Sequence, residues 1–469
     1  MKPRTLLILL VAVLGLGAFI WFYERELPSS EEREELEKKV VSFEKDEVTA
    51  VTIEASRGRV RLERIGTPEP AAKKDGEAPE PLSAGTEWRM LEPFTTRADA
   101  FAVDRLLDSV TSLARTRTLE DFNPKDVGLD KPRATVRLKT KDGEKVLQIG
   151  AGVPTGGSLI AGLQGEKEAY VVPDTILTEF DRDPGDWRDR LMFRGEREAI
   201  QRITLRGAEG GPVVLTQRPN GFWIEQPVAV SDRADREAVD GLLSDLSGLT
   251  AEQFADGPQP LAELGLAPPR EVIEVTFKGQ PKPERIELGA PVTGEAAPEG
   301  QAAGELTWAR ASNTVFQVRT RLAESVRRVP SEWRARQLSA LEVHDVETAT
   351  VGDGKTSFQL TRSGTDWKRG DTLISFLPVS DLLSAVTGAK ADRLLAPEGV
   401  RLAKPLFTFT LKGKETGEET LTVYPPIPEG VPARSSGRQT VLLLPKSALQ
   451  EIQKKVAEVK AAKPVTPAK

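Results

Sequence analysis

The sequence predicts an α+β fold in which three similar, strand-rich modules follow a single N-terminal transmembrane helix. Three repeated features predict this architecture. A strand pattern that contains a tryptophan precedes an amphipathic helix pattern, and a proline turn that leads into further strands follows it. Because these features recur three times in the same order, they indicate tandem copies of one unit, each with a mainly antiparallel sheet and helices.

The helix pattern is the most regular of the three features. In each copy the apolar residues stand at relative positions 0, 3, 4, 7 and 10, which is the spacing of one buried helix face. Asp99, Asp235 and Ser375 stand four residues before the first apolar position and can cap the first turn. The three apolar stripes are Val103, Leu106, Leu107, Val110 and Leu113; Val239, Leu242, Leu243, Leu246 and Leu249; and Val379, Leu382, Leu383, Val386 and Ala389.

The strands are predicted on either side of this helix. Trp88, Trp223 and Trp367 precede it, and we expect all three to be core residues at equivalent positions. After the helix, a turn with proline launches the next strand, since proline forces its predecessor into an extended conformation. Those strands are expected at residues 134–138, 272–277 and 407–411.

These patterns divide the chain into modules at 46–198, 199–340 and 341–453. Residues 66–85, rich in Pro, Ala, Glu and Lys, are expected to form a disordered insertion within the first module. Residues 454–469 are expected to form a disordered tail because Lys, Ala and Pro dominate them.

The N-terminal segment predicts membrane attachment. Lys2 and Arg4 precede an uncharged, apolar run at 6–23, so residues 1–5 are expected in the cytoplasm and the modules outside the cytoplasmic membrane. The alternative is a cleaved secretory signal, but its apolar core would be shorter and its cleavage site clearer. Residues 24–45 are rich in Glu, Lys and Arg and predict a charged stalk helix.

The first two modules end on similar tryptophan and arginine residues. One interpretation is an anion site, since two neighbouring guanidiniums can share a carboxylate or phosphate. The favoured interpretation is a contact between modules, with the tryptophan packed and the arginines paired to acids. The residues expected to make these structural or partner contacts are Trp187, Arg188, Arg190, Trp333, Arg334 and Arg336.

Composition argues against several kinds of chemistry. The chain has no cysteine, which excludes thiolate sites, and its single histidine, His344, argues against a histidine-assisted nucleophile. The net charge of −6, with acids and bases interspersed, predicts no nucleic-acid binding. Residues 349–356 come close to a phosphate-binding loop but fit a hairpin turn better. We therefore predict no catalytic residues, no cofactor and no metal.

The anchor, the tryptophan strand, the Val-Asp-Arg-Leu-Leu helix at 103–107, the Gly-Leu-Asp-Lys-Pro turn at 128–132 and the Trp-Arg-Asp-Arg ending at 187–190 together resemble the bacterial domain-of-unknown-function 4340 family. The resemblance covers nearly everything after the stalk. It implies a single-span envelope protein with tandem modules, in many cases encoded beside components of gliding-type ABC transporters. The third copy departs from the pattern, since it lacks the Gly-Leu pair and the Trp-Arg ending.

The expected function is that of a non-enzymatic envelope protein, a scaffold or accessory subunit that binds other membrane proteins. The resemblance implies ABC transporter components among these partners. The alternative is an extracytoplasmic enzyme that acts on cell-wall or surface glycan. A metal, a sugar or an acid pair in a cleft, seen in one module but not in its sisters, would favour that alternative.

Overall fold

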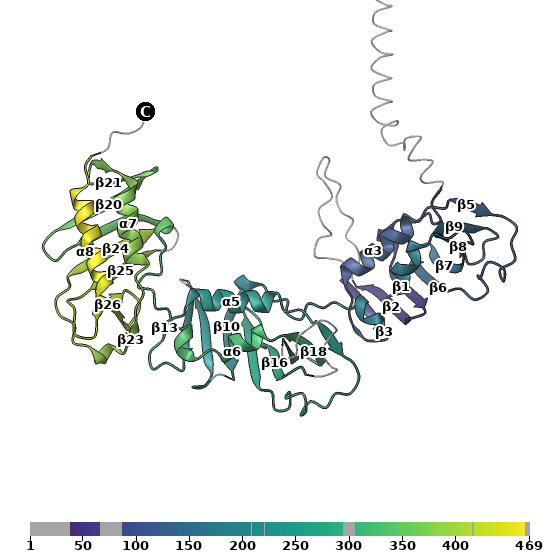
Figure 1. Cartoon of the computed structure of the whole chain (residues 1–469), viewed down its shortest axis with the longest axis horizontal. Coiled ribbons are helices and arrows are strands. Elements are labelled where there is room, and N and C mark those ends of the chain that lie inside the picture. The colour runs from purple at the N-terminus through teal and green to yellow at the C-terminus, as the bar shows by residue number, and fades with distance from the viewer. Residues whose placement is uncertain are drawn as a thin grey trace, which may run out of the picture. The chain divides into compact units, whose positions relative to one another are not determined.

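The computed structural model describes residues 38–65, 87–207, 209–219, 221–293, 305–414 and 417–464. These residues form three nine-stranded antiparallel sheets and six α-helices (Figure 1). The chain divides into two compact units, one ending at Arg190 and the other beginning at Leu191. The first unit contains the first sheet, and the second unit contains the second and third sheets.

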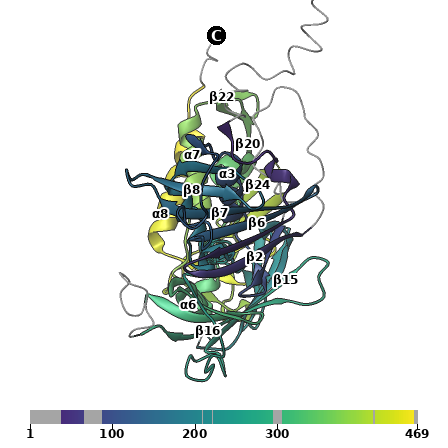
Figure 2. The same ribbon diagram turned by 90° about the vertical axis from the view of Figure 1, so that its right-hand side faces the viewer.

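The first sheet has the strand order β4-β3-β2-β1-β6-β7-β8-β9-β5, and Figure 2 shows β2, β6, β7 and β8 following one another in that order. Its short outer strands limit the exposed edge that another chain could pair with. The strands are β1 (Ala50–Ala55), β2 (Gly58–Ile65), β3 (Glu87–Glu92), β4 (Thr96–Arg97), β5 (Arg117–Leu119), β6 (Ala134–Thr140), β7 (Gly143–Gly152), β8 (Ser158–Leu163) and β9 (Ala169–Pro173).

The second sheet repeats this order as β13-β12-β11-β10-β15-β16-β17-β18-β14. Its strands are β10 (Ile200–Arg206), β11 (Val213–Arg218), β12 (Gly221–Gln226), β13 (Asp232–Arg233), β14 (Gln253–Ala255), β15 (Glu271–Phe277), β16 (Glu284–Pro291), β17 (Leu306–Ala311) and β18 (Thr314–Arg319).

The third sheet has the same order again, β22-β21-β20-β19-β24-β25-β26-β27-β23. The identical topology of the three sheets confirms the predicted repetition. Its strands are β19 (Val346–Gly352), β20 (Ser357–Ser363), β21 (Asp366–Arg369), β22 (Thr372–Ile374), β23 (Arg393–Leu395), β24 (Phe407–Gly413), β25 (Glu418–Val423), β26 (Val431–Ser435) and β27 (Val441–Leu444).

The three predicted helices form as α3 (Ala100–Thr111), α5 (Arg236–Ser247) and α7 (Phe376–Thr387). All fifteen residues of the predicted apolar stripes are buried, although the last of each stripe lies just beyond its helix. Asp99 and Asp235 cap their helices, with Asp99 accepting from the amide of Phe101 at 2.9 Å and Asp235 from that of Ala238 at 3.0 Å. Ser375 stands at the same position but its side chain makes no cap hydrogen bond.

Each stripe should therefore contribute similarly to the stability of its module. We expect Leu106→Ala, Leu242→Ala and Leu382→Ala each to lower the free energy of unfolding by about 2–5 kcal/mol, because each deletes a fully buried side chain and leaves a cavity. Denaturant unfolding measures the loss. Phe101→Ala is the matched control, since Phe101 is 88% exposed on α3, and should change stability by less than about 0.5 kcal/mol. A loss below 1 kcal/mol at all three leucines would contradict the shared core.

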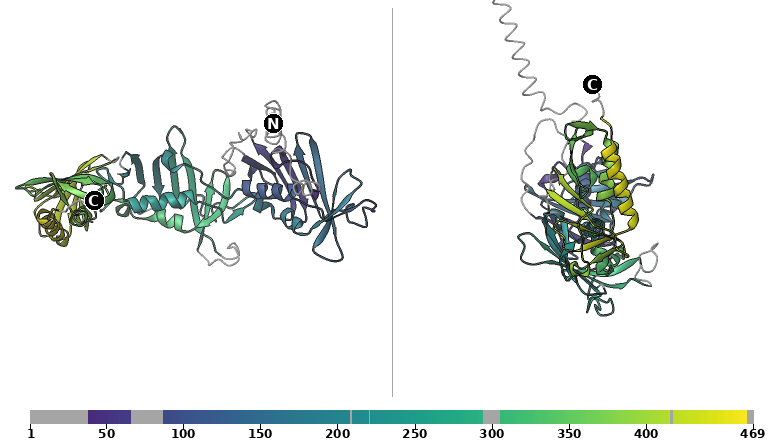
Figure 3. Two further views of the ribbon diagram at one scale, coloured as in Figure 1. Left: turned by 90° about the horizontal axis from the view of Figure 1, so that it is seen from above. Right: turned by 90° about the vertical axis from the view of Figure 1, so that its left-hand side faces the viewer.

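The remaining helices differ among the copies. The first two modules have the short helices α4 (Thr175–Phe180) and α6 (Arg321–Arg327), whereas the third has the longer α8 (Lys446–Ala461), which lies along α7 (Figure 3, right, yellow). Short 3-10 turns complete the folded elements: η2 (Lys45–Glu47), η3 (Pro184–Trp187), η4 (Arg197–Ala199), η6 (Pro330–Trp333), η7 (Val343–Asp345) and η8 (Pro397–Gly399).

Helix α8 corrects the prediction of a disordered tail at 454–469. Residues 454–461 are helical, and Pro464 forms a β-bridge with Ile374. Val456 and Val459 continue a buried stripe begun by Leu449 and Ile452 at helical spacing, which outweighs the Lys- and Ala-rich composition. Residues 465–469 lie outside the described residues.

The end of the predicted stalk also differs from expectation. The described residues 38–45 do not form a stalk helix that stands apart from the first module. Lys39 bridges Ala114, and Val40 and Val41 are buried in the first core. These two valines gain more by joining the core than by remaining on a solvated helix.

Residues 191–198, predicted as part of the first module, lie in the second unit. Phe193 is buried in the second core, with its ring 5.9 Å from that of Phe277.

The predicted equivalence of the three tryptophans is wrong for Trp223. Strand pairing places Trp88 opposite Arg64 and Trp367 opposite Arg362, and both tryptophans are buried. In the second sheet the corresponding pair is Gln217 and Phe222, so Phe222 takes the core position. Trp223 is displaced by one residue, and since successive side chains of a strand point to opposite faces, it lies half-buried outside the core.

The near-motif at residues 349–356 is a structural turn. Residues 349–356 form the end of β19 and the turn to β20, in which the Asp353 carboxylate accepts from the amide of Thr356 at 2.7 Å. The hairpin prediction for 349–356 is thereby confirmed.

The predicted transmembrane segment 6–23, residues 24–37 of the stalk and the insertion at 66–85 lie outside the described residues. Within the parts of the chain that the structure describes, no helix has the length and apolar character needed to cross a membrane.

Candidate functional site

The two tryptophans predicted at the module ends are core residues. Trp187 and Trp333 are both completely buried, each at the end of a 3-10 turn. A guanidinium lies over each ring, from Arg182 at 5.3 Å and from Arg328 at 5.8 Å. These rings are therefore not open to a ligand, and they fix the segment that follows them.

That segment runs beside the edge strand that precedes the main helix. Arg188 forms a β-bridge with Ala98, and Arg334 forms the equivalent bridge with Ala234. The Arg188 guanidinium lies over the Phe94 ring, 4.8 Å from its centre. Arg188 as a whole is only 5% exposed. Thus the first arginine of each predicted pair is held in the module, in the same backbone position.

The second arginines lie on the surface. The Arg190 guanidinium is 3.5 Å from the Asp186 carboxylate, and both side chains are more than 40% exposed. Arg336 is exposed, and its backbone carbonyl accepts from the amide of Ala391 at 2.8 Å. The sequence pattern suggested that both arginines of a pair could share one anion, but the structure separates the partly buried Arg334 from the exposed Arg336.

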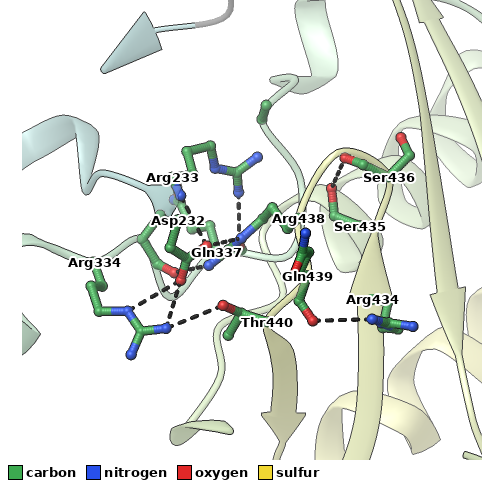
Figure 4. Close-up of polar contacts among 12 residues, drawn as sticks. Asp232, Arg233, Arg334, Gln337, Arg434, Ser435, Ser436, Arg438, Gln439 and Thr440 are labelled. Atoms are coloured by element: carbon green, nitrogen blue, oxygen red, sulfur yellow. Dashed lines mark hydrogen bonds and ion pairs between the residues drawn. The ribbon is translucent and has the colours of Figure 1, made fainter. Parts of the chain in front are cut away.

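Arg334 belongs to a buried group of charges within the second unit (Figure 4). Its Nε and Nη2 donate to Oδ2 of Asp232 at 3.2 and 2.9 Å, and Nη2 donates to the Thr440 hydroxyl at 3.2 Å. The other oxygen of Asp232 accepts from Nε of Arg438 at 2.7 Å. Because Asp232 comes from β13 and Arg438 from the turn after β26, this contact joins the second module to the third.

Asp232 is completely buried yet remains ionised. Burial by itself would raise the pKa of its carboxyl, but the hydrogen bond and charge of Arg438, together with those of Arg334, outweigh burial and hold the pKa below its usual value. The carboxylate therefore forms an ion pair with two guanidiniums at once.

Arg233 makes the second charged contact between these modules. Its Nη1 donates to Oε1 of Glu419 at 3.3 Å, and its Nη2 donates to the carbonyls of Gln337 at 2.6 Å and Ser339 at 2.8 Å. Burial, with the nearby charge of Arg438, lowers the pKa of Arg233 to about 10, so the group stays charged at neutral pH.

Glu419 and Arg438 also form hydrogen bonds to hydroxyl and backbone groups. Glu419 accepts from the hydroxyls of Ser339 and Ser435 and from the amide of Ala340. Arg438 also donates to the carbonyls of Gln337 at 3.1 Å and Ala335 at 2.8 Å. We call Asp232, Arg233, Arg334, Glu419 and Arg438 the junction cluster.

The sequence analysis identified only Arg334 of this cluster. The other four residues carry no local pattern, and Arg438 lies 206 positions after Asp232. One signal was present in the alignment of copies, since Asp232-Arg233 of the second copy corresponds to Thr96-Arg97 of the first, so that the carboxylate is specific to the second.

A cleft of about 980 Å³ opens beside the junction cluster, between the second and third modules. The β11–β12 hairpin and the start of α5 line one side, and residues 335–345, the end of α7 and the turn after β26 line the other. His344 lies at its edge with a side chain that is 74% exposed. Among the described residues, no group of three or more His, Cys, Asp or Glu side chains could hold a metal ion.

Comparison with known proteins gives one family. A family model described as "Domain of unknown function (DUF4340)" matches the chain twice, at residues 88–269 and 223–400. Each match begins at the third strand of one module and extends beyond the helix of the next, so the two matches follow the repeat. A search among curated proteins finds no match.

Proposed function

We propose, from the premise that the chain belongs to the domain-of-unknown-function family DUF4340, that it is a non-enzymatic scaffold or accessory partner-binding subunit of the cell envelope. In this proposal residues 6–23 anchor the protein in the cytoplasmic membrane, and the modules hold other membrane proteins on the extracytoplasmic side. The family resemblance suggests components of a gliding-type ABC transporter as partners.

The observation that carries the proposal is the junction cluster. Each of its five charged side chains has an oppositely charged partner within the cluster, so these groups serve to fix the third module on the second. Breaking a buried ion pair costs about 3–5 kcal/mol, so a joint of this kind resists opening. A scaffold requires such a fixed spacing between its binding surfaces.

The anchor supplies the second part of the proposal. A protein confined to the membrane meets its membrane partners at a high effective concentration, which increases weak affinities without any new contact. Residues Lys2 and Arg4 before the span favour the orientation with the N-terminus in the cytoplasm.

The experiment compares the anchored protein with a released form in which residues 1–23 are replaced by a cleavable secretory signal. We expect the anchored protein to co-purify with membrane partners and the released form to lose most of its cellular function. Single carboxylate-to-amide changes on exposed surfaces, such as Asp186→Asn, should leave function intact. If the released form works as well as the anchored one, and one exposed carboxylate change abolishes function, the glycan-directed enzyme replaces the scaffold.

A further inference from the structure

We propose that the cleft between the second and third modules binds an uncharged oligosaccharide, with Trp223 as its stacking platform. Trp223 and its neighbour Phe222 both line the cleft, which at about 980 Å³ is large enough for several sugar rings. The counterparts of this position in the other two sheets are Arg89 and Lys368, because the tryptophans of those sheets stand one residue earlier in the register. The aromatic surface in the cleft is thus specific to the second module.

The surroundings of Trp223 argue against a cationic ligand. The Arg218 guanidinium lies 4.5 Å over its ring, so the protein itself supplies the cation that an indole face attracts. Arg218 is held there by a hydrogen bond to the Ser231 hydroxyl at 2.9 Å and by the Glu225 carboxylate at 3.6 Å. A second cation at this ring would be repelled by Arg218, which argues against a lysine- or arginine-rich peptide.

The walls of the cleft argue against an anionic ligand. Six carboxylates and four guanidiniums line it, so its charge is negative. The guanidiniums are engaged, as in the pair of Arg236 with Glu342 at 2.7 Å, which crosses from the second module to the third. A phosphate or an acidic sugar would have to displace such pairs and face the excess of carboxylates.

Groups that suit sugar hydroxyls remain open. Within the described parts of the chain, the exposed side chains of Gln217, Glu198 and Glu418 take part in no hydrogen bond or ion pair, and all three line the cleft. Amide and carboxylate oxygens accept from hydroxyls, and the amide nitrogen donates to them. An aromatic ring that packs on the C–H face of a sugar, surrounded by planar polar groups, matches a neutral, hydroxyl-rich ligand.

The test uses the full chain in detergent and calorimetric titration with neutral tetrasaccharides of N-acetylglucosamine, β-1,4-linked glucose and α-1,4-linked glucose. Tetralysine and a hyaluronan tetrasaccharide serve as basic and acidic probes. We expect at least one neutral tetrasaccharide to bind, Trp223→Ala to weaken it at least tenfold, and Trp223→Phe to retain most of the affinity because a ring remains. Glu418→Gln, at an exposed position, should weaken binding severalfold without changing the unfolding midpoint.

Phe101→Ala, at an exposed aromatic residue of the first unit, is the control and should bind like the unmodified protein. The proposal is overturned if no neutral tetrasaccharide binds, if tetralysine or hyaluronan binds in its place, or if Trp223→Ala and Glu418→Gln both leave the affinity unchanged. Loss of sugar binding with retained co-purification would reject the cleft alone, whereas sugar binding without co-purification would favour the glycan-directed enzyme over the scaffold.

Discussion

Asp232→Asn is expected to lower the free energy of unfolding of the second unit by about 3–5 kcal/mol, the cost of leaving one side of a buried ion pair uncompensated. The amide preserves the shape of the side chain but removes the negative charge beside the buried Arg438 and the partly buried Arg334. Denaturant unfolding gives the size of the loss. Hydrogen exchange should place the increased opening in β13 and in the turn after β26.

Asp186→Asn is the matched control, because it removes a carboxylate from the surface pair with Arg190. Exposed pairs contribute only about 0–1 kcal/mol, so this variant should unfold like the original protein. If Asp232→Asn also lost less than 1 kcal/mol, the junction cluster would not be holding the modules together.

The acid dependence of stability follows from the same carboxylate. The pKa of Asp232 is lower in the folded protein than its ordinary value of 3.8, so the folded state binds this proton less readily than the unfolded state. Its stabilising contribution is present above pH 3.8 and is lost as the pH falls towards the folded value. Asp232→Asn should remove this component of acid destabilisation.

Gly150→Ala and Gly289→Ala should each destabilise their own module by roughly 3 kcal/mol, at the upper end of the cost of overpacking. A Cβ at Gly150 would lie 2.2 Å from the carbonyl oxygen of Val127, and one at Gly289 would lie 2.2 Å from that of Leu264. Each carbonyl accepts the amide of the residue after the glycine, at 2.8 and 2.7 Å. The clash is with backbone, which cannot rotate away as a side chain can.

Gly241→Ala provides the contrasting control. Gly241 lies inside α5 with open space at its Cβ position, so alanine should stabilise the helix by about 0.5–1 kcal/mol. Thermal unfolding followed by circular dichroism distinguishes the two directions. Equal midpoints for Gly289→Ala and Gly241→Ala would show that the turn before β15 does not need its close approach to Gly289 in β16.

This close approach also explains how the third copy departs from the other two. Strand register places Tyr424 where the first two sheets have Gly150 and Gly289. The third copy likewise lacks the Gly-Leu pair, whose glycines at 128 and 265 have φ of +72° and +68°. The turn glycines (Gly128, Gly265) and the strand glycines (Gly150, Gly289) therefore occur together in the first two copies and are both missing from the third. Each lacks a side chain where the backbone of the other segment passes close by.

The sequence by itself determined the repeat, the three main helices and most strand positions. These follow from local periodicity, since a helix with apolar residues at positions 0, 3, 4, 7 and 10 has one face that must be buried wherever it lies. The sequence also predicted that Trp187 and Trp333 are packed. It did not show which residues they pack against.

Only the tertiary structure decided what Arg334 contacts, which face Trp223 occupies and that residues 454–461 belong to a helix packed against α7. Arg233 and Glu419 are 186 positions apart, and a contact over such a separation leaves no periodic trace in the sequence. A shift of one residue in strand register moves a side chain from the core to the opposite face without changing composition, so the sequence pattern of β12 fits both arrangements. The choice between them is made by packing, which sets Phe222 against the second core and keeps Trp223 out of it, while both residues line the cleft.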